Sequence, residues 1–204
     1  MCGIVGYVGP KEAAPLLLEA LHKLEYRGYD SSGICVAANG TIQVAKARGR
    51  LQVLREMTQD GAQLPGHIGV GHTRWATHGE PSDVNSHPHL SQGGRVALVH
   101  NGIVENYMEL REFLSEKGYT FASQTDTEIA AQLIDHCYHG DPVQAVREAV
   151  NLLTGSFALG ILFKDHPDQI IAVRKDSPLI VGLGQGENFI ASDIPALLKH
   201  TRDI

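Results

Sequence analysis

The sequence is poor in cysteine. Its 204 residues contain only Cys2, Cys35 and Cys137, which are widely separated and form no CxxC pair. This odd, scattered set argues against a disulfide framework or a four-cysteine zinc site, and it favours a reducing cytoplasm. Cys35 and Cys137 lie in apolar patterns, so both are expected to be small buried hydrophobic residues. Cys2 differs from them because of its position.

Long apolar runs and a basic excess are also missing. No run approaches the roughly 20 residues of a membrane-spanning helix, and no basic stretch followed by an apolar one suggests a secretory signal. The net charge is −6, with 23 acidic and 17 basic residues interspersed. Nucleic-acid-binding surfaces carry a basic patch. Neither a membrane nor a nucleic acid is therefore an expected partner.

Strand and helix patterns alternate along the chain without an internal repeat. The 43% hydrophobic content suffices for one core. Together the patterns predict an α+β layered sandwich. Strands are expected over 3–8, 33–38, 41–47, 67–73, 95–100, 156–163, 169–173, 179–182 and 188–191. Helices are expected over 11–27, 50–59, 106–117, 125–139 and 141–153, with a short one after Asp193.

Three local signals refine this pattern. Asn39-Gly40 between two strand-like runs predicts a tight hairpin. Thr125 and Glu128 form a capping-box pattern. The segment 74–94 has no clear period and is rich in Gly, Pro, Ser, Asn and His, as is typical of a functional or disordered loop. The chain ends without a polar tail, and we expect it to be a piece of a longer protein.

Cys2 is a candidate N-terminal nucleophile. If Met1 is removed, Cys2 carries both a thiol and a free α-amine, whose pKa of roughly 8 lets it act as a base near neutral pH. The alternative is an accidental cysteine at a frayed chain start. That alternative is weakened because a strand-like run follows at once and because matching partner residues exist elsewhere.

The first group of partners lies where the predicted strand over 67–73 enters the long loop. Arg74 offers a planar fork for a substrate carboxylate, and Thr77 and His78 could add hydrogen-bond donors. The alternative is a surface arginine that packs on Trp75.

Two further groups lie later in the chain. The Asn101 amide and the Gly102 backbone N–H, at the expected end of a strand, could bind an oxyanion. Asp126, in the first turn of a predicted helix, could hold a ligand ammonium. The alternatives are an ordinary Asn-Gly turn and an acid that stabilises the helix dipole.

Two other patterns favour simpler interpretations. Five histidines lack the close spacing of a metal site, so no metal is expected. They are His72, His78, His87, His89 and His100. The segment 182–186 resembles a phosphate loop, but a strand rather than a helix follows it, which favours a glycine-rich hairpin.

Taken together, these motifs resemble those of the class II, N-terminal-nucleophile glutamine amidotransferases, in particular the members that aminate a sugar phosphate. The matching stretches follow one another in order along nearly the whole chain. They are 2–6, 24–33, 72–81, 85–89, 100–106, 125–128 and 186–193.

The resemblance implies a fold and a reaction. The fold would be the four-layer α/β/β/α sandwich of the N-terminal-nucleophile hydrolases, with residues 1–204 forming a glutaminase domain that is truncated at its C-terminal end. L-Glutamine would be split to glutamate and ammonia through a γ-glutamyl thioester, without a cofactor. Ammonia would then convert fructose 6-phosphate to glucosamine 6-phosphate in sugar-isomerising domains of the full-length chain, which are absent here. The full-length chain is expected to form a homodimer.

The resemblance also assigns roles to individual residues. Cys2 would be the nucleophile, and Asn101 and Gly102 would form the oxyanion hole. Arg27 would support the N-terminus. Glutamine would be held at its carboxylate end by Arg74, Thr77 and His78, at its amino end by Asp126 and Gly102, and beneath a closing loop that contains Trp75.

Three alternatives remain open at this stage. One is another N-terminal-nucleophile hydrolase that acts on a different amide. Another is a non-catalytic glutamine-binding sensor, which would not need Cys2, Asn101 and Gly102. A metal-dependent hydrolase is a distant third.

Overall fold

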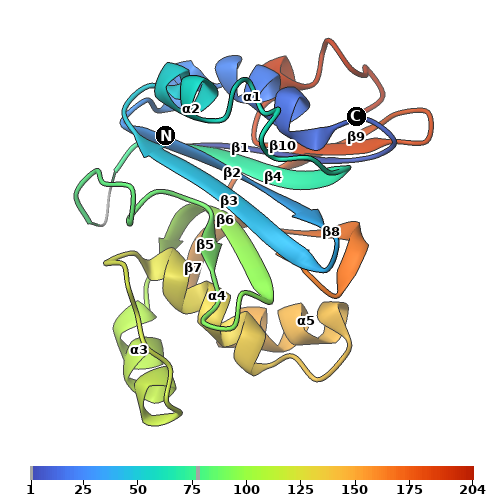
Figure 1. Ribbon diagram of the computed structural model, residues 1–204. Helices are drawn as coiled ribbons and strands as arrows, with labels where there is room; N and C mark the ends of the chain where they lie inside the picture. The colour runs from blue at the N-terminus through green and yellow to red at the C-terminus, as the bar shows by residue number, and fades with distance from the viewer. Residues whose placement is uncertain (1, 77–78) are drawn as a thin grey trace.

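Two antiparallel sheets stack face to face, and helices cover the outer face of each (Figure 1). The computed structural model describes residues 2–76 and 79–204. The larger sheet has the order β3 (Thr41–Arg48), β2 (Ser31–Ala38), β4 (Ile68–Arg74), β1 (Gly3–Val8), β10 (Asn188–Ala191) and β9 (Ile180–Leu183). The smaller sheet has the order β5 (His89–Leu90), β6 (Val96–Val104), β7 (Gly155–Phe163) and β8 (His166–Lys175).

The helices complete the four layers. The larger sheet carries α1 (Ala13–His22), α2 (Leu51–Met57) and the short 3₁₀ turns η1 (Glu25–Arg27) and η2 (Ile194–Ala196). The smaller sheet carries α3 (Tyr107–Glu116), α4 (Asp126–His136) and α5 (Pro142–Leu152). The α+β sandwich with α/β/β/α layers is therefore confirmed.

The period-two alternation of strand side chains creates three apolar layers. In β1, Ile4 points between the sheets, whereas Val5 and Tyr7 pack under α1. In β7, Ala158 lies between the sheets and Leu159 packs toward the helices on the other side. Because both faces of these strands are buried, their sequences are almost continuously apolar.

Glycines at the sheet interface let the two sheets approach closely. A Cβ at Gly160 would lie 3.0 Å from Val99 Cγ2 and 3.1 Å from Ile190 Cδ1. On the facing sheet, a Cβ at Gly6 would lie 3.3 Å from Ile170 Cδ1 of β8. Any larger side chain at these positions would push against the opposite layer.

Most predicted elements are confirmed. Asn39 and Gly40, with φ of 52° and 71°, form the predicted hairpin turn between β2 and β3. The segment 182–186 comprises the end of β9 and the turn that leads into the antiparallel strand β10, in agreement with the predicted hairpin. The helix predicted over 11–27 is shorter, because α1 ends at His22 and the 3₁₀ turn η1 follows it.

The strand predicted to end at His100 continues to Val104. Its pairing with β7 runs on to the pair Val104–Gly155, so Asn101 and Gly102 lie inside β6. The predicted strand end was therefore wrong. The segment 74–94 also contains more structure than predicted, since β5 lies in it and the side chains of 85–87 and His89 are buried.

The helix caps are partly as predicted. Thr125 caps α4 by accepting from Glu128 N, but the Glu128 carboxylate binds the backbone N–H groups of Ala122 and Ser123 instead of completing a capping box. Asn106 precedes α3 without capping it, because its side chain bridges to Leu152 O and Thr154 N.

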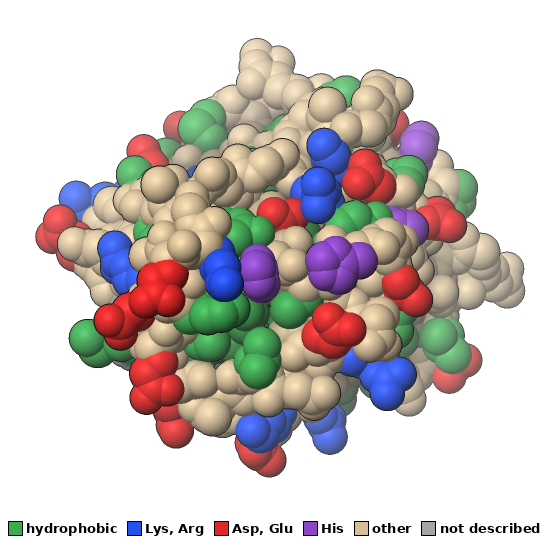
Figure 2. All heavy atoms as spheres, turned by 90° about the horizontal axis from the view of Figure 1, so that it is seen from below, with side chains coloured by type: hydrophobic (Ala, Val, Ile, Leu, Met, Phe, Trp, Pro, Cys, Tyr) green, Lys and Arg blue, Asp and Glu red, His purple; other side chains and the backbone are tan. Residues whose placement is uncertain are grey.

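The remaining predictions concern the cysteines and the surface. Cys35 is fully buried between the sheets, as predicted, whereas Cys137 is half-buried at the end of α4. Figure 2 shows the face of the helical layer with α3, α4 and α5, where acidic and basic side chains are interspersed. No helix within the described residues is long and apolar enough to cross a membrane.

The crowding around Gly160 leads to a stability prediction. Gly160→Val should lower the free energy of unfolding by about 1–3 kcal/mol, because overpacking a tight core costs this much. Strand propensity alone would favour valine over glycine, so a loss of stability can be assigned to crowding. Urea denaturation would measure it. Gly93→Val is the matched control, since a Cβ at Gly93 meets no atom of the described residues within 4 Å. Equal stability of the two variants would contradict the proposed crowding.

Candidate active site

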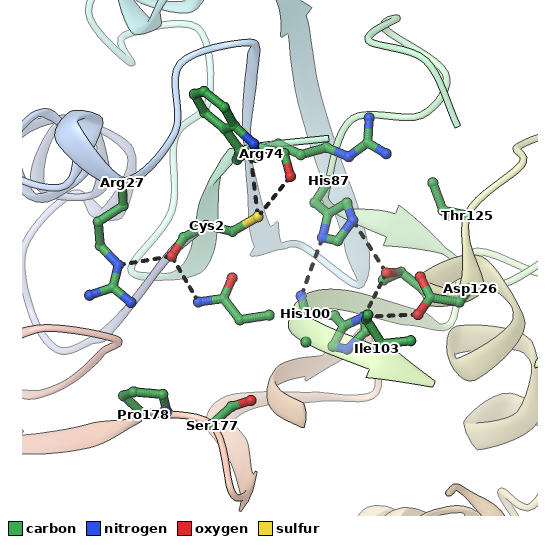
Figure 3. A pocket seen from close by; sticks show the side chains of 14 residues that line it. Cys2, Arg27, Arg74, His87, His100, Ile103, Thr125, Asp126, Ser177 and Pro178 are labelled. Atoms are coloured by element: carbon green, nitrogen blue, oxygen red, sulfur yellow. Dashed lines mark hydrogen bonds and ion pairs between the residues drawn. The ribbon is translucent and has the colours of Figure 1, made fainter. Parts of the chain in front are cut away.

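A cavity of about 270 Å³ opens where β1, β4 and β6 meet the start of α4. Figure 3 shows Cys2 on one side of it and Asp126 on the other. The lining comes from both sheets and from three loops. It comprises Cys2, Arg27, Arg74, Trp75, His87, 100–103, 125–127, Ser177 and Pro178.

The Cys2 carbonyl is held by two donors from different parts of the chain. Arg27 Nε donates to Cys2 O at 3.0 Å, and Asn101 Nδ2 donates to the same oxygen at 3.1 Å (Figure 3). Arg27 is in turn fixed by Asp193, whose Oδ2 lies 2.9 Å from Nη1 and also accepts from the Tyr26 hydroxyl. The position of Cys2 is thus fixed from both sides.

The Cys2 thiol faces the backbone of Trp75. Trp75 N donates to Cys2 Sγ at 3.2 Å, and Sγ lies 3.5 Å from Trp75 O. Burial raises the pKa of the Cys2 thiol above its ordinary value of 9.0, and the Trp75 N–H offsets part of this increase. The group is therefore a thiol near neutral pH and needs a base to become a nucleophile.

The segment 28–30 holds the backbone of residues 74–76 in place. Asp30 N donates to Arg74 O at 3.2 Å, and the Asp30 carboxylate accepts from Ala76 N. A Cβ at Gly28 would lie 2.8 Å from Trp75 N, so only glycine lets the two backbones come this close. The Trp75 side chain itself is half exposed and makes an edge-to-face contact with Tyr29 at 5.6 Å.

Asn101 and Gly102 lie beside Cys2 within β6. Asn101 is buried, and one hydrogen of its amide remains beyond the bond to Cys2 O. Gly102 has a φ of +112°, and a Cβ there would lie 2.1 Å from Ser156 O. Only glycine fits this position of the strand.

Arg74 and Asp126 supply opposite charges to the same cavity. Arg74 is 4% exposed, and its Nη2 donates to Gly79 O at 3.1 Å. Burial lowers the pKa of Arg74, although an arginine stays protonated. Asp126 is 5% exposed, and its Oδ2 accepts from Val104 N at 2.8 Å. A small zwitterion could therefore bridge the two groups.

The buried histidines form a stacked, hydrogen-bonded group. The rings of His72 and His87 stack with centroids 4.1 Å apart. Both nitrogens of His87 are used, because His100 N lies 3.3 Å from Nδ1 and Thr127 Oγ1 lies 3.2 Å from Nε2. Burial lowers the pKa of His87 well below its ordinary range. Within 2–76 and 79–204, no three His, Cys, Asp or Glu residues are placed to hold a metal ion.

The structure brings most of the predicted site residues together. Seven line the cavity, whereas Thr77 and His78 lie outside the described residues. Sequence reasoning missed the parts played by Asp30 and Asp193, both of which lie in stretches quoted for the resemblance. The seven residues are Cys2, Arg27, Arg74, Trp75, Asn101, Gly102 and Asp126.

Comparison with known proteins agrees with this geometry. A family model described as a glutamine amidotransferase domain matches residues 72–199. The glutamine phosphoribosylpyrophosphate amidotransferase of B. subtilis has the same fold, with a TM-score of 0.85 and 26% identity over 98% of this chain and 44% of that one. The chain belongs to the glutamine amidotransferase domain family.

Two relatives of higher sequence identity share one more specific name. The whole chain is 61% identical to glutamine–fructose-6-phosphate aminotransferase [isomerizing] of Caldanaerobacter subterraneus subsp. tengcongensis, of which it covers 33%. It is 52% identical to an enzyme of the same name from Thermus thermophilus, again covering 33%. The chain thus spans about a third of the length of these relatives.

The raised pKa of Cys2 predicts how the thiol reacts with iodoacetamide. Below that pKa the thiolate fraction rises about tenfold per pH unit, so labelling of Cys2 should accelerate steeply between about pH 7 and pH 9. Mass spectrometry separates labelling of the Cys2 peptide from that of Cys137, whose pKa burial also raises and whose labelling should therefore rise with pH as well. A labelling rate that stays flat over this range would mean that the thiolate is already formed.

Proposed function

We propose that this domain hydrolyses L-glutamine to L-glutamate and ammonia, with Cys2 as the nucleophile. The observation that carries the proposal is that Cys2, Asn101, Arg74 and Asp126 line one cavity. This set combines a thiol, an amide donor, a cation and an anion. Glutamine offers a matching amide, carboxylate and ammonium.

The residues have complementary roles in the reaction. Arg74 binds the glutamine carboxylate and Asp126 binds its ammonium, which places the side-chain amide at Cys2. Sγ attacks the amide carbon, and the negative charge that develops on the oxygen is stabilised by Asn101 Nδ2 and Gly102 N. Ammonia leaves with a proton from the base, and water then hydrolyses the γ-glutamyl thioester.

The Cys2 α-amine is the base in this mechanism. Among the described residues, the hydrogen bonds of Cys2 Sγ go to backbone atoms of Trp75, not to an imidazole or a carboxylate. An α-amine with a pKa of roughly 8 can take up the thiol proton. Met1 must be removed for this, and the mass of the mature N-terminus tests that step directly.

The ammonia serves amino-sugar synthesis in the full-length protein. This part of the proposal rests on the 61% identity to an isomerising glutamine–fructose-6-phosphate aminotransferase. Sugar-isomerising domains of the same chain would receive the ammonia and add it to fructose 6-phosphate, and the complete chain would act as a homodimer. Residues 1–204 alone should release free ammonia and make no glucosamine 6-phosphate.

A non-catalytic glutamine sensor is the second candidate, and the role of Cys2 separates the two. Cys2→Ala should abolish glutamate release, because it removes the attacking sulfur, while glutamine still binds. Coupled glutamate assay and calorimetry measure the two properties. Cys137→Ala, a half-buried cysteine outside the cavity, should keep full activity. Undiminished turnover in Cys2→Ala would exclude Cys2 as the nucleophile.

The charged residues should govern recognition of glutamine. Arg74→Ala and Asp126→Asn each remove one charge-assisted hydrogen bond, worth about 1.5–3 kcal/mol, so kcat/KM should fall roughly ten- to 150-fold. Steady-state kinetics at several glutamine concentrations would show this. Arg111→Ala and Asp168→Asn make the same changes at exposed positions and should have little effect. An unchanged kcat/KM would leave the residue concerned without a role in binding.

A further inference from the structure

The nucleophile and the oxyanion donor come from different sheets, and one buried histidine connects these sheets at the cavity. Ile68, Val70 and His72 occupy alternate positions of β4, and the first two point between the sheets. Ala97, Val99 and Asn101 follow the same pattern in β6. Because strand side chains alternate with a period of two, His72 and Asn101 meet at the sheet interface.

The contact between them is short and buried. His72 Nε2 lies 3.0 Å from Asn101 Oδ1 and 3.0 Å from the backbone oxygen of His100. The His100 carbonyl can only accept a hydrogen bond, so His72 Nε2 must carry the proton. Asn101 Oδ1 is therefore also an acceptor from the same N–H.

This proton determines which way the Asn101 amide faces. The oxygen and nitrogen of an asparagine amide are nearly identical in shape, so its orientation is decided by its partners. With Oδ1 on His72, Nδ2 points at Cys2 O, 3.1 Å away. A flipped amide would place its NH₂ against the His72 N–H and its oxygen against the Cys2 carbonyl, and both contacts would be repulsive.

The surroundings of His72 keep the imidazole in this one form. The ring is fully buried and stacked on His87, and burial lowers the pKa of His72 to about 3. His72 is therefore neutral near pH 7, with a single ring proton. Nδ1 has no hydrogen-bond partner within the described residues, so a proton there would be a buried, unpaired donor.

We propose that His72 is a positioning residue that, through its Nε2–H, holds the Asn101 amide with Nδ2 toward the Cys2 reaction centre. His72 itself is not among the residues that line the cavity. The inference rests on the proposed glutaminase function only for its kinetic consequence, because the orientation of Asn101 is a property of the resting protein.

The kinetic test uses variants that differ in the donor at this point. His72→Phe keeps a stacked ring and removes the N–H, so kcat should fall up to ~100-fold, in the range seen when an oxyanion donor is lost. KM should change little, because Arg74 and Asp126 are untouched. His72→Gln, which can donate from its amide, should recover much of kcat. His67→Phe is the matched control, since it makes the same change at an exposed position just before β4.

A double-mutant cycle separates positioning from general damage. If His72 acts through Asn101, His72→Phe should have almost no further effect on kcat in an Asn101→Ala background. Losses that multiply in the double variant would overturn the inference, as would a single variant with the kcat of the unmodified protein.

Imidazole ¹⁵N NMR tests the resting state without any need for activity. His72 should show a protonated Nε2 and a bare Nδ1, unchanged between about pH 5 and pH 8. An Nδ1-protonated ring, or one that titrates in this range, would overturn the inference even if kcat falls. If the unmodified protein releases no glutamate, the proposed function fails, and this measurement still decides the role of His72.

Discussion

The cavity depends on how closely the two sheets stack. Cys2 is attached to the larger sheet and Asn101 belongs to the smaller one, yet Asn101 Nδ2 lies 3.1 Å from Cys2 O. Gly6 and Gly160 have no side chain at the interface, and this lets the two layers come together. An added Cβ at either position would lie within 3.4 Å of the opposite layer. The close packing of apolar side chains therefore also sets the distance between Asn101 Nδ2 and Cys2 O at the end of the same interface. The packing of the core thus determines the geometry of the site.

Much of this arrangement could be predicted from the sequence. The succession of strand and helix patterns predicted the layered sandwich, and Asn39-Gly40 predicted the hairpin. The position of Cys2, directly before a buried strand, also distinguished it from Cys35 and Cys137. These features are local, so one sequence is enough to find them.

The parts that the sequence did not reveal depend on contacts between distant segments. Asn-Gly favours a turn, but pairing with β7 keeps Asn101 and Gly102 inside a strand. Glu128 has the spacing of a capping box, yet the neighbouring loop uses its carboxylate. Asp193 binds Arg27 across 166 positions of the chain, and no periodicity within either segment indicates such a pair. Local propensity loses in each case to a tertiary partner.

The place of β1 in its sheet has a consequence for how the protein is made. β1 is the first strand of the chain, but it pairs with β4 on one side and β10 on the other. Ile4 N also donates to Ser192 Oγ, and Arg27 needs Asp193. On a ribosome, the start of the chain must therefore wait until β10, at Asn188–Ala191, has been made before its strand is fully paired. Contacts so far apart in sequence are slow to form, so the cysteine is synthesised early but reaches its final environment only late in folding.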